Sequence, residues 1–308
     1  MRNLGERGAE RSVRVLLALL LRVLARVPDS AAITVSGWIA TLLIWSRADI
    51  ARISEINLTH CFPELDDTQR KHRLHRSLTH ASLLIFEFAY LQHQSISKLL
   101  DKIVAVEGAA LLQEAWQQGD GVVLLMPHFG CWEFLSIYLG DHYSISALYD
   151  PPNVSALENA MTRMRERQGA TMHPTTGAGL RGLMRGLKSG DLVVVLPDQV
   201  PLEKNGVVAP FFGKPARTML LGKRLMQVGQ PRVILAAAWR EIGPDGIGYR
   251  LSFEAPADAL HSSQDVEHAT ALNAGIEAIV RRDPAQYQWS YKRFRRIAED
   301  ALDIYRRQ

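Results

Sequence analysis

The chain has few cysteines and no repeated or low-complexity segment. Its 308 residues include two cysteines, Cys61 and Cys131. This scarcity is typical of a reducing compartment and argues against a disulfide framework. At this length the chain can bury one large α/β core, alone or with a helical subdomain. The hydrophobic share of 47% argues against a disordered protein.

The sequence also lacks the patterns that hold metals, nucleotides and nucleic acids. Its histidines, cysteines and carboxylates do not recur at metal-ligand spacings, and it has no phosphate-binding glycine loop. We therefore expect no metal and no cofactor. Lysine and arginine exceed aspartate and glutamate by 36 − 32 = 4, which favours anionic partners such as a phosphorylated lipid, a membrane surface or an acidic carrier protein. Nucleic acid would be a competing partner, but no nucleic-acid-binding motif accompanies the charge.

No uninterrupted apolar run reaches the roughly 20 residues that a membrane-spanning helix needs. Two shorter apolar helices are expected instead, at 12–27 and 31–45. Five arginines follow one side of the first, within an arc of roughly 120°, which is typical of a basic helix lying in a membrane interface. They are Arg7, Arg11, Arg14, Arg22 and Arg26. We interpret residues 1–46 as membrane-attachment helices and 47–308 as a catalytic domain. Alternatively, the first helices dock on the core as ordinary amphipathic helices.

Short apolar runs bounded by turn residues indicate buried strands. They are expected at 122–126, 192–196 and 233–239. Helical patterns lie between them, and this alternation predicts an α/β fold with a central, largely parallel sheet flanked by helices. A strand with alternating polar residues at 248–253 is expected at the sheet edge. Residues 215–228 have the pattern of a helix.

His128 and Glu133 are the first candidate catalytic pair. His128 follows the predicted strand 122–126 through Pro127, at the carboxyl end, where open α/β sheets place their ligand sites. Glu133 falls in the first turn of the next helix. A neutral histidine in the turn can remove a proton from an attacking hydroxyl while the carboxylate orients its ring. The alternative is a core histidine beside a glutamate that the helix dipole favours.

A second strand end repeats the first arrangement. The strand 192–196 is followed by Pro197 and Asp198. Two parallel strands that end side by side would bring His128 and Asp198 to one rim of the sheet. The alternative for Asp198 is an ordinary turn aspartate. His173 is expected in a loop, and nothing in the sequence places it at a site.

Five segments, taken together, resemble one family. They are NLTHCFPE (57–64), PHFGCWE (127–133), LPDQ (196–199), APFFGKPA (209–216) and QYQWSYKRFR (286–295). On these motifs the chain resembles the bacterial late lipid A acyltransferases, the lauroyl and myristoyl transferases of lipopolysaccharide assembly, over about residues 13–296. The resemblance implies that Asp198 and Gln199 bind or support substrate and that Arg165 contacts an acceptor phosphate. A solvated basic face is the alternative for Arg165.

The resemblance further implies acyl carrier protein as the acyl donor, a phosphorylated glycolipid as the acceptor, and attachment to the cytoplasmic face of a bacterial inner membrane. The expected mechanism is direct transfer. His128 deprotonates an acceptor hydroxyl, Glu133 orients His128, and backbone N–H groups or a basic side chain hold the oxyanion. Cys131 could instead form an acyl-enzyme with His128. Other candidate functions are a lysophospholipid or other glycolipid acyltransferase, an acyl-thioester hydrolase and a non-catalytic lipid-binding protein.

Overall fold

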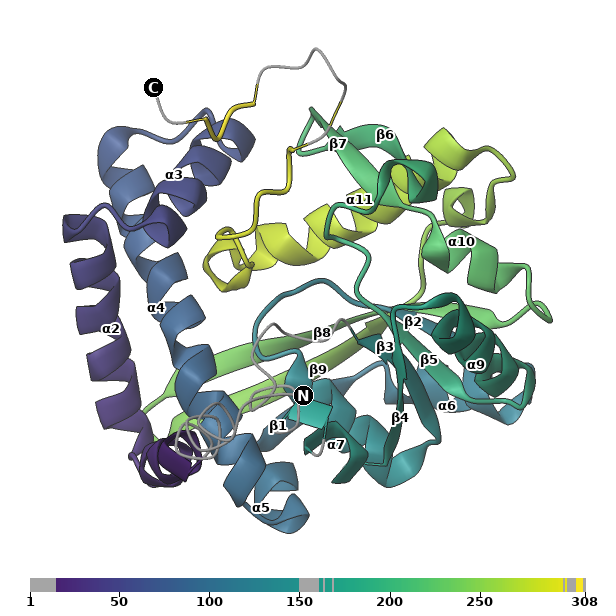
Figure 1. The fold of residues 1–308 in the computed structure, drawn as a ribbon, viewed down its shortest axis with the longest axis horizontal. Helices are drawn as coiled ribbons and strands as arrows, with labels where there is room; N and C mark the ends of the chain where they lie inside the picture. Colours follow the sequence, from purple (N-terminus) through teal and green to yellow (C-terminus); the bar gives the residue numbers. More distant parts are fainter. Residues whose placement is uncertain are drawn as a thin grey trace, which may run out of the picture.

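The computed structural model describes residues 15–149, 161–162, 164–167, 169–295, 297 and 303–306. Within these ranges a central sheet has the strand order β1-β9-β8-β2-β5-β3-β4, and β6 and β7 form a separate hairpin (Figure 1). The strands are β1 Ile103–Glu107, β2 Val122–Leu125, β3 Ile145–Tyr149, β4 Ala170–Pro174, β5 Leu192–Val195, β6 Gly206–Phe211, β7 Lys214–Met219, β8 Arg232–Gly243 and β9 Gly246–Glu254. The helices are α2 Asp29–Trp45, α3 Asp49–Cys61, α4 Asp67–His93, α5 Ile96–Leu100, α6 Ala109–Gln117, α7 Glu133–His142, α9 Gly177–Lys188, α10 Leu221–Met226 and α11 Asp265–Arg282.

The sheet is mostly parallel. The pairs β2–β8, β2–β5, β3–β5 and β3–β4 are parallel, as is β1–β9. The β8–β9 pair is antiparallel, because a tight turn at Gly243 and Gly246 connects the two strands directly. The predicted α/β class with a largely parallel sheet flanked by helices is therefore confirmed.

Alternate residues of the central strands face opposite layers of helices. Val123 and Leu125 of β2 belong to the core cluster that includes the apolar side of α11, whereas Val122 and Leu124 belong to the cluster that includes α6 and α7. A strand covered on both faces reads as a continuous apolar run. This explains why β2 and β5 were recognisable in the sequence and why their carboxyl ends meet between the two layers.

The sequence expectations for residues 248–253 and 215–228 are wrong. The strand predicted at 248–253 is not at the edge, because β1 pairs with the outer side of β9. Residues 215–228 do not form one helix. Their first part is β7, which pairs with β6 from Phe211↔Lys214 to Gly206↔Met219, and only Leu221–Met226 is helical. Phe212 and Gly213 form the hairpin turn with φ of +51° and +69°, and the pairing of β6 with β7 overrides the helical pattern.

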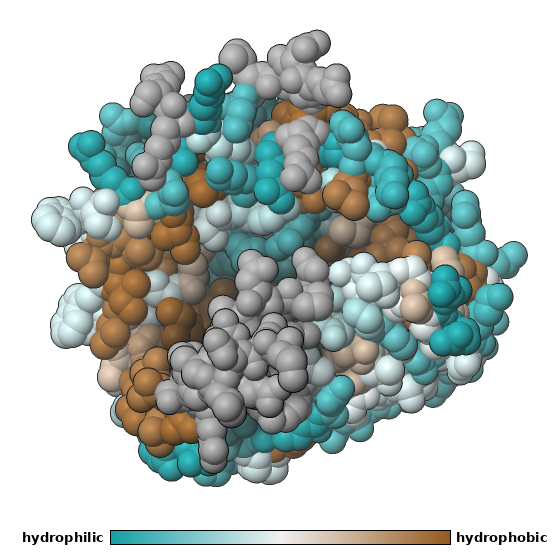
Figure 2. Space-filling model, in the orientation of Figure 1, coloured by the Kyte–Doolittle hydropathy of each residue, from teal (hydrophilic) through white to brown (hydrophobic). Residues whose placement is uncertain are grey.

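The N-terminal helices pack on one side of α4 and leave apolar side chains on the surface. Leu21 and Ala25 are buried against Ala89 of α4. Trp38 and Trp45 of α2 are 69% and 81% exposed, and Figure 2 shows hydrophobic surface gathered over this side of the molecule. Arg22 and Arg26 are exposed, and the other three arginines of the predicted basic face lie outside the described residues.

No single described helix is both long enough and apolar enough to cross a membrane. The pair α2 and α3 meets the length and composition criteria only together, and it bends by 85° between its two helices.

Candidate active site

The candidate active site is built at the neighbouring ends of β2 and β5. The two strands pair in parallel with Leu125 opposite Val195. Each continues for two residues, the second a proline, which has no N–H to extend the ladder. His128 follows β2 and Asp198 follows β5, so the two residues leave the sheet at the same height. The prediction that these residues meet at one rim of the sheet is confirmed.

His128 and Asp198 form a hydrogen-bonded pair. The ring Nδ1 of His128 lies 2.7 Å from Asp198 Oδ1, and the backbone N–H of His128 donates to Oδ2 at 2.9 Å. Asp198 is 2% exposed. Because a carboxylate can only accept, Nδ1 carries the proton and Nε2 carries the lone pair. The pair therefore presents a base toward the side of the ring opposite Asp198.

Buried groups behind Asp198 keep its carboxyl ionised. Burial alone would raise the pKa of Asp198, but the charge of His128, its ring and backbone hydrogen bonds, and nearby Arg293 outweigh this effect and lower the pKa. Burial, followed by the charge of Asp198, raises the pKa of the nearby Tyr287 hydroxyl. Arg293 is itself buried, donating to the Arg217 carbonyl at 2.6 Å. A carboxylate held ionised in this way can orient a histidine and stabilise its charged form.

Glu133 lies in the same cavity but does not hold the His128 ring. The Glu133 carboxylate accepts two hydrogen bonds from the Arg165 guanidinium, one of them from Nε at 3.1 Å. Burial alone would lower the pKa of Arg165, but the attraction of Glu133 outweighs it and raises the pKa. In this structure Asp198, rather than Glu133, supplies the carboxylate that contacts His128. The five-residue spacing between His128 and Glu133 does not bring the two side chains together, because the start of α7 turns Glu133 toward Arg165.

Gln199 lies on the base side of His128. Its Nε2 is 3.3 Å from His128 Nε2 and 3.4 Å from the side-chain oxygen of Gln288. Trp132 packs its ring edge-on to the His128 ring, with centroids 5.1 Å apart. The histidine is thus fixed by Asp198 on one side, Trp132 on a second and the Gln199 amide on a third.

The turn that carries His128 is locked by the surrounding backbone. Gly130 has φ +57°, and a Cβ there would lie 1.8 Å from the carbonyl oxygen of Ala238, so only glycine fits. Gly130 N–H donates to the Gln286 carbonyl at 2.9 Å, and Cys131 N–H donates to the Ala238 carbonyl at 3.2 Å. The turn therefore has little freedom to move on its own.

A buried ion pair between Arg240 and Glu87 lies next to this turn. Arg240 of β8 donates to Glu87 of α4 through two nitrogens, at 2.5 and 2.6 Å, and Tyr249 of β9 donates to the same carboxylate at 2.9 Å. The Cys131 thiol is buried near Glu87, and burial followed by the charge of Glu87 raises the pKa of the thiol well above its usual value. A buried thiol of this kind is a poor nucleophile.

An apolar cavity of about 390 Å³ opens beside His128. It lies between α7 and the strands β3, β4 and β5, and is walled by Leu135, Leu139, Ile145, Ala170, Met172 and Val194. His128, Glu133, Arg165 and Gln199 line its mouth, and Asp198 lies buried behind His128. The structure thus brings together all five residues that the sequence analysis selected.

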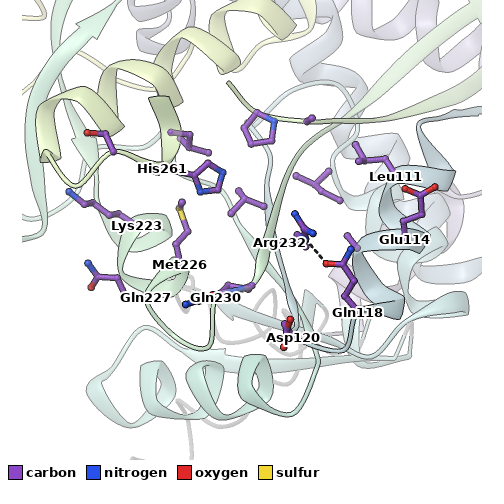
Figure 3. A pocket seen from close by; sticks show the side chains of 18 of the residues that line it. Leu111, Glu114, Gln118, Asp120, Lys223, Met226, Gln227, Gln230, Arg232 and His261 are labelled. Carbon is purple, nitrogen blue, oxygen red and sulfur yellow. Dashed lines mark hydrogen bonds between the residues drawn. The ribbon is translucent and has the colours of Figure 1, made fainter. Parts of the chain in front are cut away.

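A second cavity, of about 930 Å³, lies at the opposite ends of the central strands. Figure 3 shows His261, Met226 and Arg232 facing it, with Arg232 donating to Gln118. Lys223 is already bonded to Asp265 and to the Ser263 carbonyl. Arg232 opens β8 at the amino ends of the parallel strands, so this cavity is remote from the His128–Asp198 pair.

Three residues around the pair were not selected from the sequence: Tyr287, Gln288 and Arg293. All lie in the 286–295 segment, which the sequence analysis used only as a family motif. His173 is part of β4, not of a loop, and packs against Gly182 of α9, where a Cβ would lie 2.6 Å from the ring.

Comparison with known proteins places this chain in a family. Residues 9–296 match the model of the bacterial lipid A biosynthesis acyltransferases. A lipid A biosynthesis acyltransferase of Haemophilus influenzae is 30% identical over 262 residues, covering 84% of this chain and 81% of the relative. A lipid A biosynthesis palmitoleoyltransferase of Escherichia coli K12 is 28% identical, and the match covers 87% of this chain and 86% of the relative. A lipid A biosynthesis lauroyltransferase of the same organism is 23% identical, and the match covers 83% of this chain and 82% of the relative.

These matches define the class of protein as an acyltransferase enzyme of the lipid A biosynthesis type. The chain belongs to the bacterial lipid A biosynthesis acyltransferase family, as its motifs had indicated.

Proposed function

We propose that this enzyme moves a fatty acyl group from an acyl thioester, carried by acyl carrier protein, to a hydroxyl of a lipid A precursor. One observation carries this proposal. The His128–Asp198 pair, joined at 2.7 Å, stands at the mouth of an apolar cavity. A base beside an acyl-sized apolar hollow suits the attack of a hydroxyl on an acyl group whose tail is buried.

His128 acts as the general base in this mechanism. Its Nε2 removes the proton from the acceptor hydroxyl while the oxygen forms a bond to the thioester carbonyl carbon. The resulting tetrahedral intermediate collapses with cleavage of the carbon–sulfur bond. The imidazolium then returns its proton to the leaving thiolate. Asp198 takes the role first predicted for Glu133, because it fixes the ring and stabilises the imidazolium. Glu133 instead holds Arg165 at the cavity mouth.

The acceptor is proposed to be a phosphorylated glycolipid. Because Glu133 neutralises Arg165, Arg165 is a weaker candidate for a phosphate contact than the sequence suggested. Arg165 and Glu133 together still present a polar mouth to an apolar cavity, which suits a substrate with a polar head and a hydrophobic tail.

We place the enzyme at the cytoplasmic face of the inner membrane, attached through residues 1–46. The exposed apolar side chains of this region, Val15, Leu16, Leu19, Leu20, Val23, Trp38, Leu42 and Trp45, form the surface that would enter the lipid (Figure 2). Exposed Arg22 and Arg26 beside them favour anionic lipids. An apolar surface beside basic residues matches an interfacial helix pair better than a solvated face.

The first test is a mass-spectrometric transfer assay. Detergent-solubilised protein is given acyl-carrier-protein donors of several chain lengths and an under-acylated lipid A precursor, and wild type is compared with His128→Ala, Asp198→Asn and Glu133→Ala. We expect wild type to add the mass of one acyl group and His128→Ala to add none. No gain with any donor would refute the lipid A acceptor and direct the assay to lysophospholipids. Release of free acid as fast as transfer would indicate a hydrolase.

Membrane attachment is tested separately by co-sedimentation with anionic phospholipid vesicles. The double variant Trp38→Ser, Trp45→Ser should lose most vesicle binding, because it removes two large exposed side chains from the apolar surface. Val266→Ser on α11 is the matched control, since Val266 is 54% exposed but lies elsewhere. Equal binding of both variants and wild type would contradict the attachment surface.

A further inference from the structure

The transfer mechanism proposed above leaves one chemical requirement open. The carbonyl oxygen gains negative charge in the tetrahedral intermediate, and a hydrogen-bond donor must meet it. Active sites at the ends of α/β strands often use free backbone N–H groups of the turn for this purpose.

In this enzyme the N–H groups of residues 128–131 are already bonded inside the protein. Their acceptors are Asp198 Oδ2 for His128, the Pro127 carbonyl for Phe129, the Gln286 carbonyl for Gly130 and the Ala238 carbonyl for Cys131, at 2.8–3.2 Å. Because the turn is locked by these bonds and by the left-handed Gly130, it cannot swing a donor toward the substrate. These four N–H groups are therefore not available to the oxyanion, and a side chain that lines the cavity is the alternative donor.

Gln199 is the donor nearest to the reacting atoms. Its amide nitrogen lies 3.3 Å from His128 Nε2, at the position the acceptor hydroxyl must take to give up its proton. The other hydrogen of the same amide points to the Gln288 side-chain oxygen at 3.4 Å. Both contacts are long for hydrogen bonds of this type, so an entering hydroxyl can displace the amide at small cost.

We propose that Gln199 is a catalytic residue that donates its amide N–H to the oxyanion. The acceptor hydroxyl displaces the amide from His128 Nε2. As the oxygen–carbon bond forms, the carbonyl π electrons move onto the carbonyl oxygen. The displaced N–H of Gln199 then donates to that oxygen. When the carbon–sulfur bond breaks, the carbonyl re-forms and the amide returns to His128.

Arg165 is the competing donor, since it also lines the mouth. Its Nε and one terminal nitrogen are occupied by the Glu133 carboxylate. It also has no bond to His128 or Asp198 among those described, whereas Gln199 contacts the base directly. The observations therefore favour Gln199.

The test compares wild type with Gln199→Leu, which keeps the side-chain bulk and removes the amide. Gln227→Leu, at the remote cavity of Figure 3, is the matched control and should behave as wild type. The donors are the acyl-carrier-protein thioester that wild type uses and its dithioester analogue, in which sulfur replaces the carbonyl oxygen. We expect Gln199→Leu to lower kcat by about 10²–10³-fold, with KM for both substrates within about threefold.

The dithioester separates catalysis from a structural effect. Sulfur accepts hydrogen bonds weakly, so wild type should prefer the thioester, and Gln199→Leu should lose most of that preference. A variant with wild-type kcat, or with reduced kcat and an unchanged preference, would overturn the inference. This inference rests on the proposed function, and the two fail differently. If wild type transfers and His128→Ala does not, but Gln199→Leu is normal, only the role of Gln199 is wrong.

Discussion

Replacing Asp198 by asparagine changes the fewest atoms that the proposed mechanism depends on. The Asp198 carboxylate accepts two hydrogen bonds from His128, from the ring at 2.7 Å and from the backbone at 2.9 Å. Asparagine has one acceptor oxygen, so it can satisfy only one of them. The other position must be taken by an NH₂ group.

Each of the two amide orientations has a different cost. If the NH₂ group faces the backbone N–H of His128, two donors meet in a buried site, which costs about 1–3 kcal/mol. If it faces Nδ1 instead, the ring must accept there and carry its proton on Nε2, where the base is needed. The second orientation avoids the clash and removes the base. We therefore expect transfer to fall by about 10⁴-fold, the loss found when a triad aspartate becomes asparagine, or about 5 kcal/mol in the barrier.

Initial transfer rates from the mass-spectrometric assay measure this effect, and circular dichroism melting confirms that the variant is folded. Asp191→Asn is the matched control. Asp191 precedes the same strand at its other end and accepts the Ser146 hydroxyl at 2.7 Å, so its transfer rate should stay near that of wild type. If Asp198→Asn kept more than a tenth of wild-type activity while Glu133→Gln lost it, Glu133 would be the working partner of His128 and the reasoning would be refuted.

Three further predictions concern buried groups. Cys131→Ser should keep transfer within about threefold of wild type, because the thiol is buried on Glu87; loss of transfer in folded protein would indicate an acyl-enzyme. Arg240→Met leaves Glu87 buried without its cation, and urea unfolding should show a loss of about 3–5 kcal/mol. The loss should be about 1 kcal/mol or less for Arg250→Met, because Arg250 is half-buried but pairs with the exposed Glu107 and Glu241. Burial, followed by Arg240, lowers the pKa of His80 to about 3. Below about pH 6.5 the unfolded state therefore binds a proton that the folded state does not. As the pH is lowered from about 6.5 toward 3, the free energy of unfolding should decrease by up to about 1.4 kcal/mol per pH unit. His80→Phe should reduce this dependence on pH.

The central part of the fold could be predicted because it is buried on both faces. The strands β2 and β5 appear in the sequence as apolar runs that end at a proline, and their parallel pairing follows from the helices between them. The strands β1 and β4 were missed because their residues are mostly half-buried or exposed, so they show no continuous apolar run. The misplacement of β9 at the edge follows directly from missing β1.

The identities of the site residues could be predicted better than their partners. The end of a strand marks His128 and Asp198, but which carboxylate reaches the ring depends on the order of strands in the sheet. That order is set by contacts between segments 70 residues apart in the chain. The role of Tyr287 and Arg293 behind Asp198 depends on how the segment after α11 crosses the catalytic edge, and no local pattern encodes that crossing.

The parallel pairing of β2 and β5 also limits where this chain can change in length. His128 lies three residues beyond Leu125, and Asp198 lies three residues beyond Val195, its partner in the sheet. One residue inserted into either connection would move a catalytic group by about 3.3 Å. A shift of that size would break the 2.7 Å hydrogen bond between His128 and Asp198. Before β2, and likewise before the neighbouring strand β8, Gly119 and Gly229 stand in open space, where an added Cβ meets nothing within 4 Å. Insertions and deletions should therefore be tolerated before the strands begin and excluded just after they end.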